Sequence, residues 1–381
     1  MSEAILLVGG KGTRLRPLTT HTPKPMVRAA GVPFLAHQIS RAAAAGVTRI
    51  VLATSYLAEV FEEHFGDGQK EFGLDLVYVT EAVPLGTGGA IRNAARQLTA
   101  GPDEPVLVFN GDILSGVDIT ELLHQHHHSH ADVTLHLTRV ADPRAFGLVP
   151  TDPHGRVLAF LEKPETPEQI VTDQINAGCY VFTRSVIDTI PTDREVSVER
   201  ETFPALLTNG GHLHGVVDTT YWLDLGTPTA FAKGSADLVL GLVDSPALPG
   251  PTGDALVLPG AHVSPHALLS GGTAISEDAH VDDGAVIEAS ILLPGARIGA
   301  DAVIRNSIIG HHAHVGPRTH LDGVTLGDAA HIGADNELTN GARIACGTHL
   351  PDASLRFSPG TMTCTPHLGA LPQTAPAHAH A

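Results

Sequence analysis

The sequence contains little cysteine, few aromatic residues and a shortage of positive charge. Its 381 residues include three cysteines, an odd and scattered set that argues against a disulfide framework and against a zinc site. Lysine and arginine number 23 against 41 aspartates and glutamates, which gives a formal net charge of −18 with histidine neutral. Because so acidic a chain repels polyanions, nucleic acid and anionic membrane surfaces are not expected partners.

Long apolar runs and targeting signals are also missing. No stretch of about 18 uninterrupted apolar residues occurs, so we expect no membrane span. The N-terminal MSEAILLVGG has neither the basic region nor the cleavage site of a signal peptide. We therefore expect a cytoplasmic protein.

Apolar strand-like runs alternate with helix-like runs from residue 1 to about residue 243. The run AILLV at 4–8 is followed by an alanine-rich helical segment over 33–45, which ends at Gly46. Strand, helix, strand at this spacing is typical of a parallel sheet with helices on both faces. We therefore predict a Rossmann-like α/β domain over 1–243 with a mostly parallel mixed sheet. The other predicted strands are 49–54, 76–81, 105–112, 132–140, 156–162, 176–182 and 212–218, and the other predicted helices are 57–65, 88–98, 199–209 and 228–243.

The pattern changes after this domain. Residues 244–256 are rich in proline and glycine and are predicted to form a linker. Over 257–350 branched apolar residues recur about every six positions, which predicts a left-handed parallel β-helix. Its coils are expected to associate, so we predict a homo-oligomer. Residues 351–381 lose the pattern and are predicted to be a poorly ordered tail. Three blocks with a 17-residue period align the pairs Ile298-Gly299, Val315-Gly316 and Ile332-Gly333.

The histidine-rich segment HQHHHSH at 124–130 has the composition of a metal-binding tract. It contains no cysteine, it follows the helical segment ITELLHQ, and its neighbours are polar. We therefore predict an exposed helix end here.

The first strand ends in GGKGTRL, residues 9–15. This segment does not fit the P-loop pattern G-x-x-x-x-G-K-[ST], and Leu15 stands where the dinucleotide fingerprint G-x-G-x-x-G has its third glycine. Glycines nevertheless let backbone N–H groups approach phosphate oxygens, and Arg14 and Lys24 add positive charge. On these residues alone, a phosphate site and a tight turn with surface cations both remain open.

The wider stretch LLVGGKGTRLRPLTTHTPKPM resembles the signature GGxGTRLxPLTxxxPKP of the sugar-1-phosphate nucleotidyltransferase family. Every signature position is present, and with the predicted β-helix the resemblance covers nearly the whole chain. It implies that a nucleoside triphosphate and a sugar 1-phosphate give a nucleotide sugar and pyrophosphate, by in-line attack without a protein nucleophile. Further family motifs are PLGTGGA (84–90), FNGD (109–112), FG (146–147), EKP (162–164), INAG (175–178) and WLDLGTP (222–228).

The resemblance also implies a Mg²⁺ site. It places Asp112, at the end of a predicted buried strand, close to Asp224 in a Trp-Leu-Asp-Leu run. Hard carboxylate oxygens with room for phosphate oxygens suit magnesium. Without the resemblance, Asp112 would be interpreted as a turn residue and Asp224 as a helix N-cap.

The remaining site residues follow from the same resemblance. Arg14 and Lys24 would act on the phosphates of the nucleotide, and Lys163 would hold the sugar phosphate as the third catalytic residue. The implied nucleotide-binding residues are Gly9, Gly10, Gly12, Thr13, Gly86 and Thr87, where a side chain at position 86 would block the base. The implied hexose-binding residues are Gly147, Glu162, Asn176 and Gly178.

Two stretches favour one branch of the family. EAVPLGTGGA and VERETFP resemble the guanylyltransferases, which implies GTP and mannose 1-phosphate as substrates. One alternative is a glucose-1-phosphate enzyme that uses UTP, dTTP or ATP. A second alternative is a catalytically silent regulatory subunit that binds a nucleotide sugar. An active enzyme is favoured because the charged motif residues are all present, namely Arg14, Lys24, Asp112, Lys163 and Asp224. A third, acyltransferase activity in the β-helix, is disfavoured because the helix is short.

Overall fold

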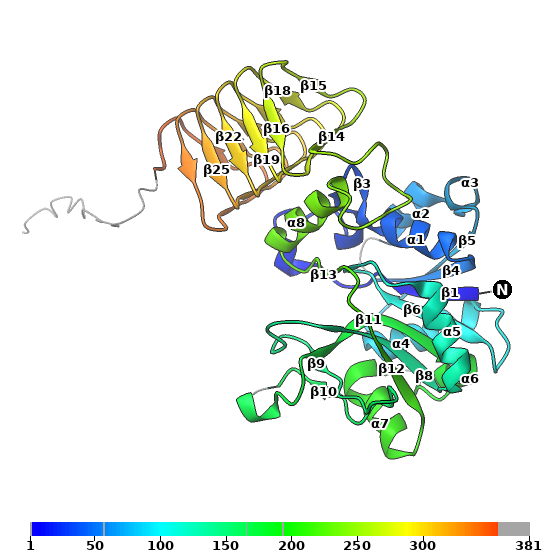
Figure 1. The fold of residues 1–381 in the computed structure, drawn as a ribbon. Helices are drawn as coiled ribbons and strands as arrows, with labels where there is room; N and C mark the ends of the chain where they lie inside the picture. Colours follow the sequence, from blue (N-terminus) through cyan, green and yellow to red (C-terminus); the bar gives the residue numbers. More distant parts are fainter. Residues whose placement is uncertain (1, 56–57, 165, 193, 357–381) are drawn as a thin grey trace, which may run out of the picture.

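The computed structural model describes residues 2–55, 58–164, 166–192 and 194–356, which form an α/β domain with a β-helix beside it (Figure 1). Within these residues, one nine-stranded mixed sheet runs through the α/β domain. Its strands are β1 (Ser2–Leu7), β4 (Val47–Thr54), β5 (Asp75–Thr80), β6 (Pro105–Asn110), β8 (Val133–Arg139), β9 (Gly147–Leu148), β10 (Leu161–Glu162), β11 (Gln174–Thr183) and β12 (Leu213–Val217). The main path is β10-β9-β11-β6-β1-β4-β5, and β8 joins β11 to β12. The neighbours β6, β1, β4 and β5 are parallel, whereas β11 is antiparallel to β6 and β8.

Helices cover both faces of this sheet because its central strands are apolar on both sides. In β1, Ile5 packs into one core cluster with Ile91, whereas Leu6 packs into another with Leu35, and all four side chains are fully buried. Such two-sided burial is typical of parallel strands. The α-helices are α1 (Phe34–Ala44), α2 (Glu59–Phe65), α3 (Gln69–Phe72), α4 (Gly86–Ala94), α5 (Ile119–Ser129), α6 (Arg184–Asp188), α7 (Phe203–Thr208) and α8 (Pro228–Val239). Shorter turns are η1 (Thr13–Leu15), η2 (Lys24–Met26), η3 (Ala95–Gln97), η4 (Pro167–Gln169) and the π-helical η5 (Val198–Thr202).

A short antiparallel ribbon leaves the sheet just after β6. It pairs β7 (Ile113–Ser115) with β13 (Trp222–Asp224) and sets Asp224 opposite Ile113. The backbone N–H of Leu225 donates to the carbonyl of Asp112 at 2.9 Å. Residues that are far apart in the sequence therefore meet at the end of β6. A second hairpin pairs β2 (Arg28–Ala29) with β3 (Val32–Pro33).

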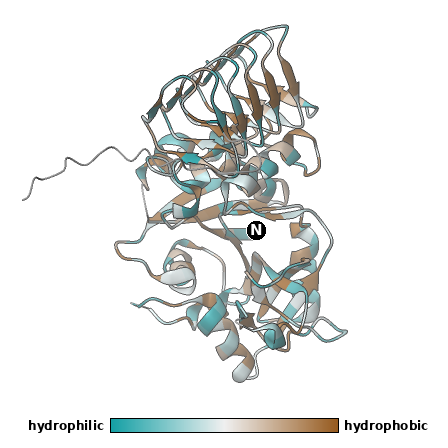
Figure 2. Ribbon diagram, turned by 90° about the vertical axis from the view of Figure 1, so that its left-hand side faces the viewer, coloured by the Kyte–Doolittle hydropathy of each residue, from teal (hydrophilic) through white to brown (hydrophobic). Residues whose placement is uncertain are grey.

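The β-helix consists of three parallel sheets, in which apolar strand residues face inward (Figures 1 and 2). Ile298, Val315 and Ile332 occupy successive rungs of one sheet, so the predicted 17-residue register is confirmed. The first sheet holds β14 (Ala255–Val257), β17 (Thr273–Ile275), β20 (Ile291–Leu292), β23 (Ile308–Ile309), β26 (Thr325–Leu326) and β29 (Arg343–Ile344). The second holds β15 (His262–Val263), β18 (His280–Val281), β21 (Arg297–Ile298), β24 (His314–Val315), β27 (His331–Ile332) and β30 (His349–Leu350). The third holds β16 (Leu268–Ser270), β19 (Val286–Glu288), β22 (Val303–Arg305), β25 (His320–Asp322) and β28 (Glu337–Leu338).

Two predictions about local structure were wrong. The strand predicted over 156–162 is reduced to Leu161–Glu162 because the preceding residues make only isolated bridges, such as Val157 with Thr151. The histidine-rich segment does end a helix, but His126 is buried, where its ring bonds to the hydroxyls of Thr134 and Thr183. Burial lowers the pKa of His126 to about 4, which keeps this ring neutral.

Only the first residues of the predicted tail belong to the described part of the chain. Of the predicted tail, residues 351–356 are described, and the backbone N–H of Ser354 donates to Asn336 at 2.9 Å. Residues 357–381 lie outside the described part.

Among the described helices, none combines the length and the apolarity that a membrane crossing would require.

Candidate active site

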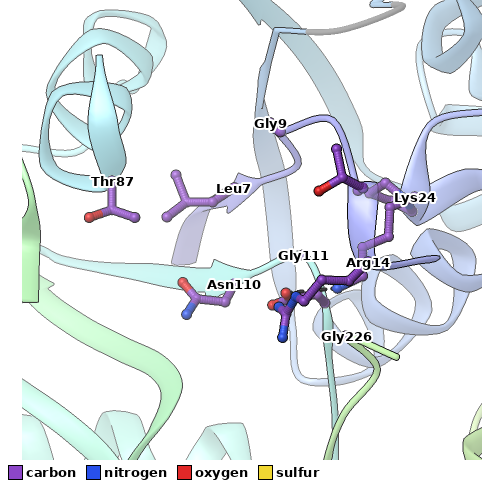
Figure 3. A pocket seen from close by; sticks show the side chains of 13 residues that line it. Leu7, Gly9, Arg14, Lys24, Thr87, Asn110, Gly111 and Gly226 are labelled. Atoms are coloured by element: carbon purple, nitrogen blue, oxygen red, sulfur yellow. Dashed lines mark hydrogen bonds and ion pairs between the residues drawn. The ribbon is translucent and has the colours of Figure 1, made fainter. Parts of the chain in front are cut away.

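A cavity opens beyond the carboxyl ends of the neighbouring strands β1 and β6 (Figure 3). This central cavity has a volume of about 370 Å³. Loops that follow parallel strands converge at the same edge of a sheet, so distant segments meet here. The predicted residues that line it are Gly9, Gly10, Gly12, Thr13, Arg14, Lys24, Thr87 and Asp112.

Two short 3₁₀ helices carry the cations of the central cavity. Arg14 lies in η1 and Lys24 begins η2, and Thr87 lies across the cavity from both (Figure 3). A Cβ at Gly226 would lie 2.8 Å from the central carbon and from both terminal nitrogens of the Arg14 guanidinium. These equal distances mean that the guanidinium lies flat against the backbone of Gly226.

The two predicted metal-binding carboxylates lie at the same end of the β7–β13 ribbon, and Asp112 lines the central cavity. Nζ of Lys24 lies 2.8 Å from Oδ2 of Asp112, and the Lys24 side chain is 12% exposed. Oδ1 of Asp224 is buried and has no hydrogen-bond partner among the described residues. Burial, followed by repulsion from Asp112, raises the pKa of the Asp224 carboxyl, although Lys24 and Arg14 oppose this shift. Additional positive charge beside the Asp224 carboxylate would therefore favour its ionised form.

This arrangement fits a divalent cation. Asp112 and Asp224 supply hard carboxylate oxygens, and the adjoining cavity leaves space for phosphate oxygens to complete the coordination. Asp224 is not used as a helix cap, because Thr227 caps α8 by accepting a hydrogen bond from the N–H of Ala230. The unpaired oxygen of Asp224 has no structural role that would compete with a metal.

A second cavity, of about 420 Å³, adjoins the first and shares Leu7, Gly9, Gly10 and Thr87 with it. We call it the base cavity, because the predicted base-binding residues Gly86 and Thr87 line it. Glu81 follows β5 and lines this cavity. Its Oε2 accepts a hydrogen bond from the N–H of Leu85 at 3.2 Å, but its Oε1 is buried without a partner within the described chain. Burial raises the pKa of Glu81. A donor-rich ligand edge would satisfy this oxygen.

Gly86 and Thr87 also line the base cavity, and the backbone at Gly86 imposes a constraint of its own. Gly86 has φ +69°, and a Cβ there would lie 2.5 Å from the carbonyl oxygen of Val196. A side chain at Gly86 would therefore strain the backbone and collide with Val196. Thr87 donates to Oε2 of Glu199 at 2.7 Å and accepts from the N–H of Val198 at 2.9 Å.

A third hollow of about 530 Å³ contains the predicted sugar-phosphate residue. Lys163 and Glu162 line it together with Glu199, and Nζ of Lys163 lies 3.5 Å from Oε1 of Glu162. Lys163 does not line the central cavity, and its side chain is 60% exposed. We call this hollow the sugar cleft, after the predicted role of Lys163. The hydrogen bond between Glu199 and Thr87 connects it to the other two cavities.

The other predicted hexose-binding residues lie near the β9–β10 and β11 strands. Gly147 pairs with Glu162, and a Cβ at Gly147 would lie 2.7 Å from Oε2 of that glutamate. Asn176 donates to the hydroxyl of Tyr180 at 2.7 Å and accepts from the N–H of Gly178 at 3.1 Å. Gly178 lines a separate small cavity of about 40 Å³. Glu162 lines the third hollow and Gly178 lines the small cavity, so the predicted hexose-binding residues do not all face one hollow.

Comparison with known proteins assigns this geometry to a family. A family model described as nucleotidyl transferase matches residues 3–239, which contain the three hollows and both carboxylates. The chain belongs to the nucleotidyl transferase family. A second model, described as GMPPB C-terminal domain, matches residues 252–356 of this nucleotidyl transferase.

Several named proteins are similar to this nucleotidyl transferase. The mannose-1-phosphate guanylyltransferase of Mycobacterium tuberculosis is 58% identical over 357 residues, which are 93% of this chain and 98% of the relative. The mannose-1-phosphate guanylyltransferase catalytic subunit beta of Drosophila melanogaster is 37% identical over 267 residues, 69% of this chain and 71% of the relative. HddC from Yersinia pseudotuberculosis, solved in complex with GMP-PN, is 29% identical with a TM-score of 0.52, over 62% of this chain and 98% of that chain.

Sequence reasoning about this nucleotidyl transferase missed Glu81 and Glu199. Glu81 opens the stretch EAVPLGTGGA and directly follows a strand, which is a position where a carboxylate can face a ligand. Glu199 lies in the stretch VERETFP, but its contact with Thr87 depends on a pairing 112 residues apart that no local pattern indicates.

Proposed function

We propose that the protein transfers the guanylyl group of GTP to mannose 1-phosphate, which gives GDP-mannose and pyrophosphate. The near-complete similarity to the Mycobacterium tuberculosis mannose-1-phosphate guanylyltransferase, at 58% identity, is the observation that carries this proposal. The adjoining central and base cavities, together with the sugar cleft, support it because they provide separate places for phosphates, base and sugar.

The reaction needs no protein nucleophile. An oxygen of the sugar phosphate forms a bond to the α-phosphorus of GTP while the bond to the bridging oxygen of the β-phosphate breaks and pyrophosphate leaves. The barrier comes from bringing two polyanions together, so positioning and charge neutralisation are the main catalytic tasks. Arg14, held against Gly226, and the nearly buried Lys24 would bind the nucleotide phosphates. Backbone N–H groups around Gly9, Gly10, Gly12 and Thr13 would approach the same oxygens.

We propose that Asp112 and Asp224 hold Mg²⁺. When bound, the ion would supply positive charge at the α-phosphoryl group and at the leaving pyrophosphate. Lys24 pairs with Asp112 in this structure, which keeps its ammonium in the cavity where the nucleotide phosphates would bind. The unpaired Oδ1 of Asp224 supports this assignment.

We propose that Glu81 recognises the base of the nucleotide. Guanine presents N1–H and its N2 amino group as two donors on one edge, and a carboxylate can accept both. Adenine lacks this pair of donors. The buried, unpartnered Oε1 of Glu81 in the base cavity therefore favours GTP over ATP.

Lys163 is proposed to bind the phosphate of the sugar substrate. Lys163→Ala should raise KM for mannose 1-phosphate about tenfold and leave KM for GTP nearly unchanged, because the side chain lies in the sugar cleft. Initial rates with each substrate varied in turn would measure both constants, and Lys70→Ala, an exposed lysine on α3, is the matched control. An effect confined to KM for GTP would contradict this placement. Glu162, Gly147, Asn176 and Gly178 are the proposed hexose contacts.

Gly226 is expected to act through Arg14. Gly226→Ala should lower kcat about tenfold because the new methyl group would occupy the space of the guanidinium. Gly253→Ala is the control, since a Cβ there meets nothing within 4 Å. Equal rates for the two variants would show that the contact with Gly226 does not orient Arg14.

Assembly and location extend the proposal. We propose a homo-oligomer formed through the β-helix, cytoplasmic location, and domain boundaries at about 243 and 257. Light scattering of the full chain and of a variant lacking the β-helix would test the first point.

The activity itself is tested by product analysis. Purified protein with GTP, mannose 1-phosphate and Mg²⁺ should give GDP-mannose and pyrophosphate in equal amounts, and a chelator should stop the reaction. A folded protein that binds GDP-mannose without turnover would instead support the regulatory-subunit alternative.

A further inference from the structure

The last coil of the β-helix contacts the loop that carries Arg14. Nη1 of Arg343, in β29, donates to the carbonyl oxygen of Arg14 at 2.7 Å and to that of Arg16 at 3.4 Å. Sγ of Cys346 lies 3.9 Å from the carbonyl oxygen of Pro17. Arg343 and Arg14 are 329 residues apart in the sequence, so the fold creates a contact that no local pattern indicates.

Arg343 reaches the carbonyls of Arg14 and Arg16, which accept no backbone hydrogen bond within the loop itself. Within the loop, the N–H groups of Leu15, Arg16, Leu18 and Thr20 donate to the carbonyls of Gly12, Thr13, Leu15 and Pro17. The hydroxyl of Thr19 also donates to the carbonyl of Gly12, at 2.8 Å. Arg343 thus complements the internal bonds at the C-terminal end of η1, where orphan carbonyls otherwise need a donor.

Arg14 is therefore held from two sides. Its guanidinium lies against Gly226 in the central cavity, and its main-chain carbonyl receives a charge-assisted hydrogen bond from the β-helix. The α/β domain supplies the first contact and the β-helix supplies the second.

We propose that Arg343 is a positioning residue for nucleotidyl transfer, through which the β-helix fixes the backbone of Arg14. This inference rests on the proposed function. It gives the β-helix a role in the reaction beyond assembly. Arg343 does not touch substrate, but it fixes the position of the backbone from which the Arg14 side chain extends.

The test compares three variants of Arg343 in the full-length protein. Arg343→Ala should lower kcat about tenfold with little change in KM for mannose 1-phosphate, because small displacements of a catalytic group are costly. Arg343→Lys should retain most of the rate, since its ammonium can still donate to a carbonyl, and Arg343→Gln should fall between the two. Arg305→Ala is the matched control, an exposed arginine of the same β-helix that pairs with Glu288. Its rate should equal that of the wild type.

A double-mutant cycle separates positioning from a general structural effect. In an Arg14→Ala background, Arg343→Ala should cause little further loss in single-turnover rate, because the group that it positions is gone. Equal losses from Arg343→Ala with and without Arg14 would overturn the proposal, as would a wild-type rate for Arg343→Ala. If Arg343→Ala unfolded at a lower temperature than the wild type but had the wild-type kcat whenever it was folded, the effect would be one on stability alone. That result would overturn the proposal too. Inactive wild-type protein would instead refute the proposed function.

Discussion

Asp224→Asn is expected to lower Mg²⁺-dependent pyrophosphate release by at least about 10³-fold while the protein stays folded. The variant removes a half-buried carboxylate whose buried Oδ1 has no partner in the described residues, and with it half of the proposed metal site. Asp112→Asn should have a similar effect on activity. Initial rates over a Mg²⁺ titration would measure the loss. Asp335→Asn, which alters a partly exposed carboxylate of the β-helix paired with Arg318, is the control and should turn over like the wild type.

Stability gives a second readout for the same substitution. Burial and Asp112 raise the pKa of Asp224 above its ordinary value of 3.8, so the native protein holds this proton more tightly than the unfolded chain does. Stability of the metal-free protein should therefore fall as pH rises from about 3.8 through the raised native pKa, because the unfolded state binds fewer protons over that window.

Asp224→Asn should lack this contribution to the pH dependence and should also lose the stabilisation that Mg²⁺ gives at neutral pH. Thermal unfolding with and without Mg²⁺ at several pH values would measure both effects. If Mg²⁺ stabilised Asp224→Asn as much as the wild type, the metal assignment would be wrong.

Glu81→Gln is expected to lower kcat/KM for GTP about 100-fold and to change ATP use little. A glutamine presents one donor and one acceptor to the base, so its amide N–H₂ would oppose a donor of guanine where the carboxylate accepts. The preference for GTP over ATP should shrink by the same factor. Competition between the two nucleotides in one reaction would measure it.

The control for Glu81 is Glu63→Gln, an exposed carboxylate on α2. It should leave the preference unchanged. If Glu81→Gln reduced GTP and ATP use equally, the carboxylate would support the loop through its bond to Leu85 and would not read the base.

The parts of the fold that sequence predicts best are those where one local pattern determines the structure. The run around Ile5 is apolar on both faces, which marks a central strand, and the 17-residue period determines the stacking of Ile298 on Val315. The segment 156–162 misled because its apolar residues do not pair with a neighbouring strand over most of their length. His126 was mispredicted for a related reason. His127 and His128 beside it are exposed, but its own helix face turns toward Thr134.

The predicted site follows the same division. The signature loop, with Arg14 and Lys24, is contiguous in sequence, and it does line one cavity with Asp112. The unpaired oxygens of Asp224 and Glu81 depend on burial by distant segments, which no local pattern reports. Arg343 is exposed on a repeat whose sequence indicates only coil stacking, so its contact with Arg14 required the folded arrangement of the two parts.

The most direct measurement is pyrophosphate release with Mg²⁺ on a grid of substrates. GTP, UTP, dTTP, ATP and CTP would each be paired with mannose 1-phosphate and with glucose 1-phosphate. We predict that the GTP and mannose 1-phosphate pair gives the dominant rate. A dominant rate for another pair, or no release from the folded protein in any pair, would contradict the proposed function.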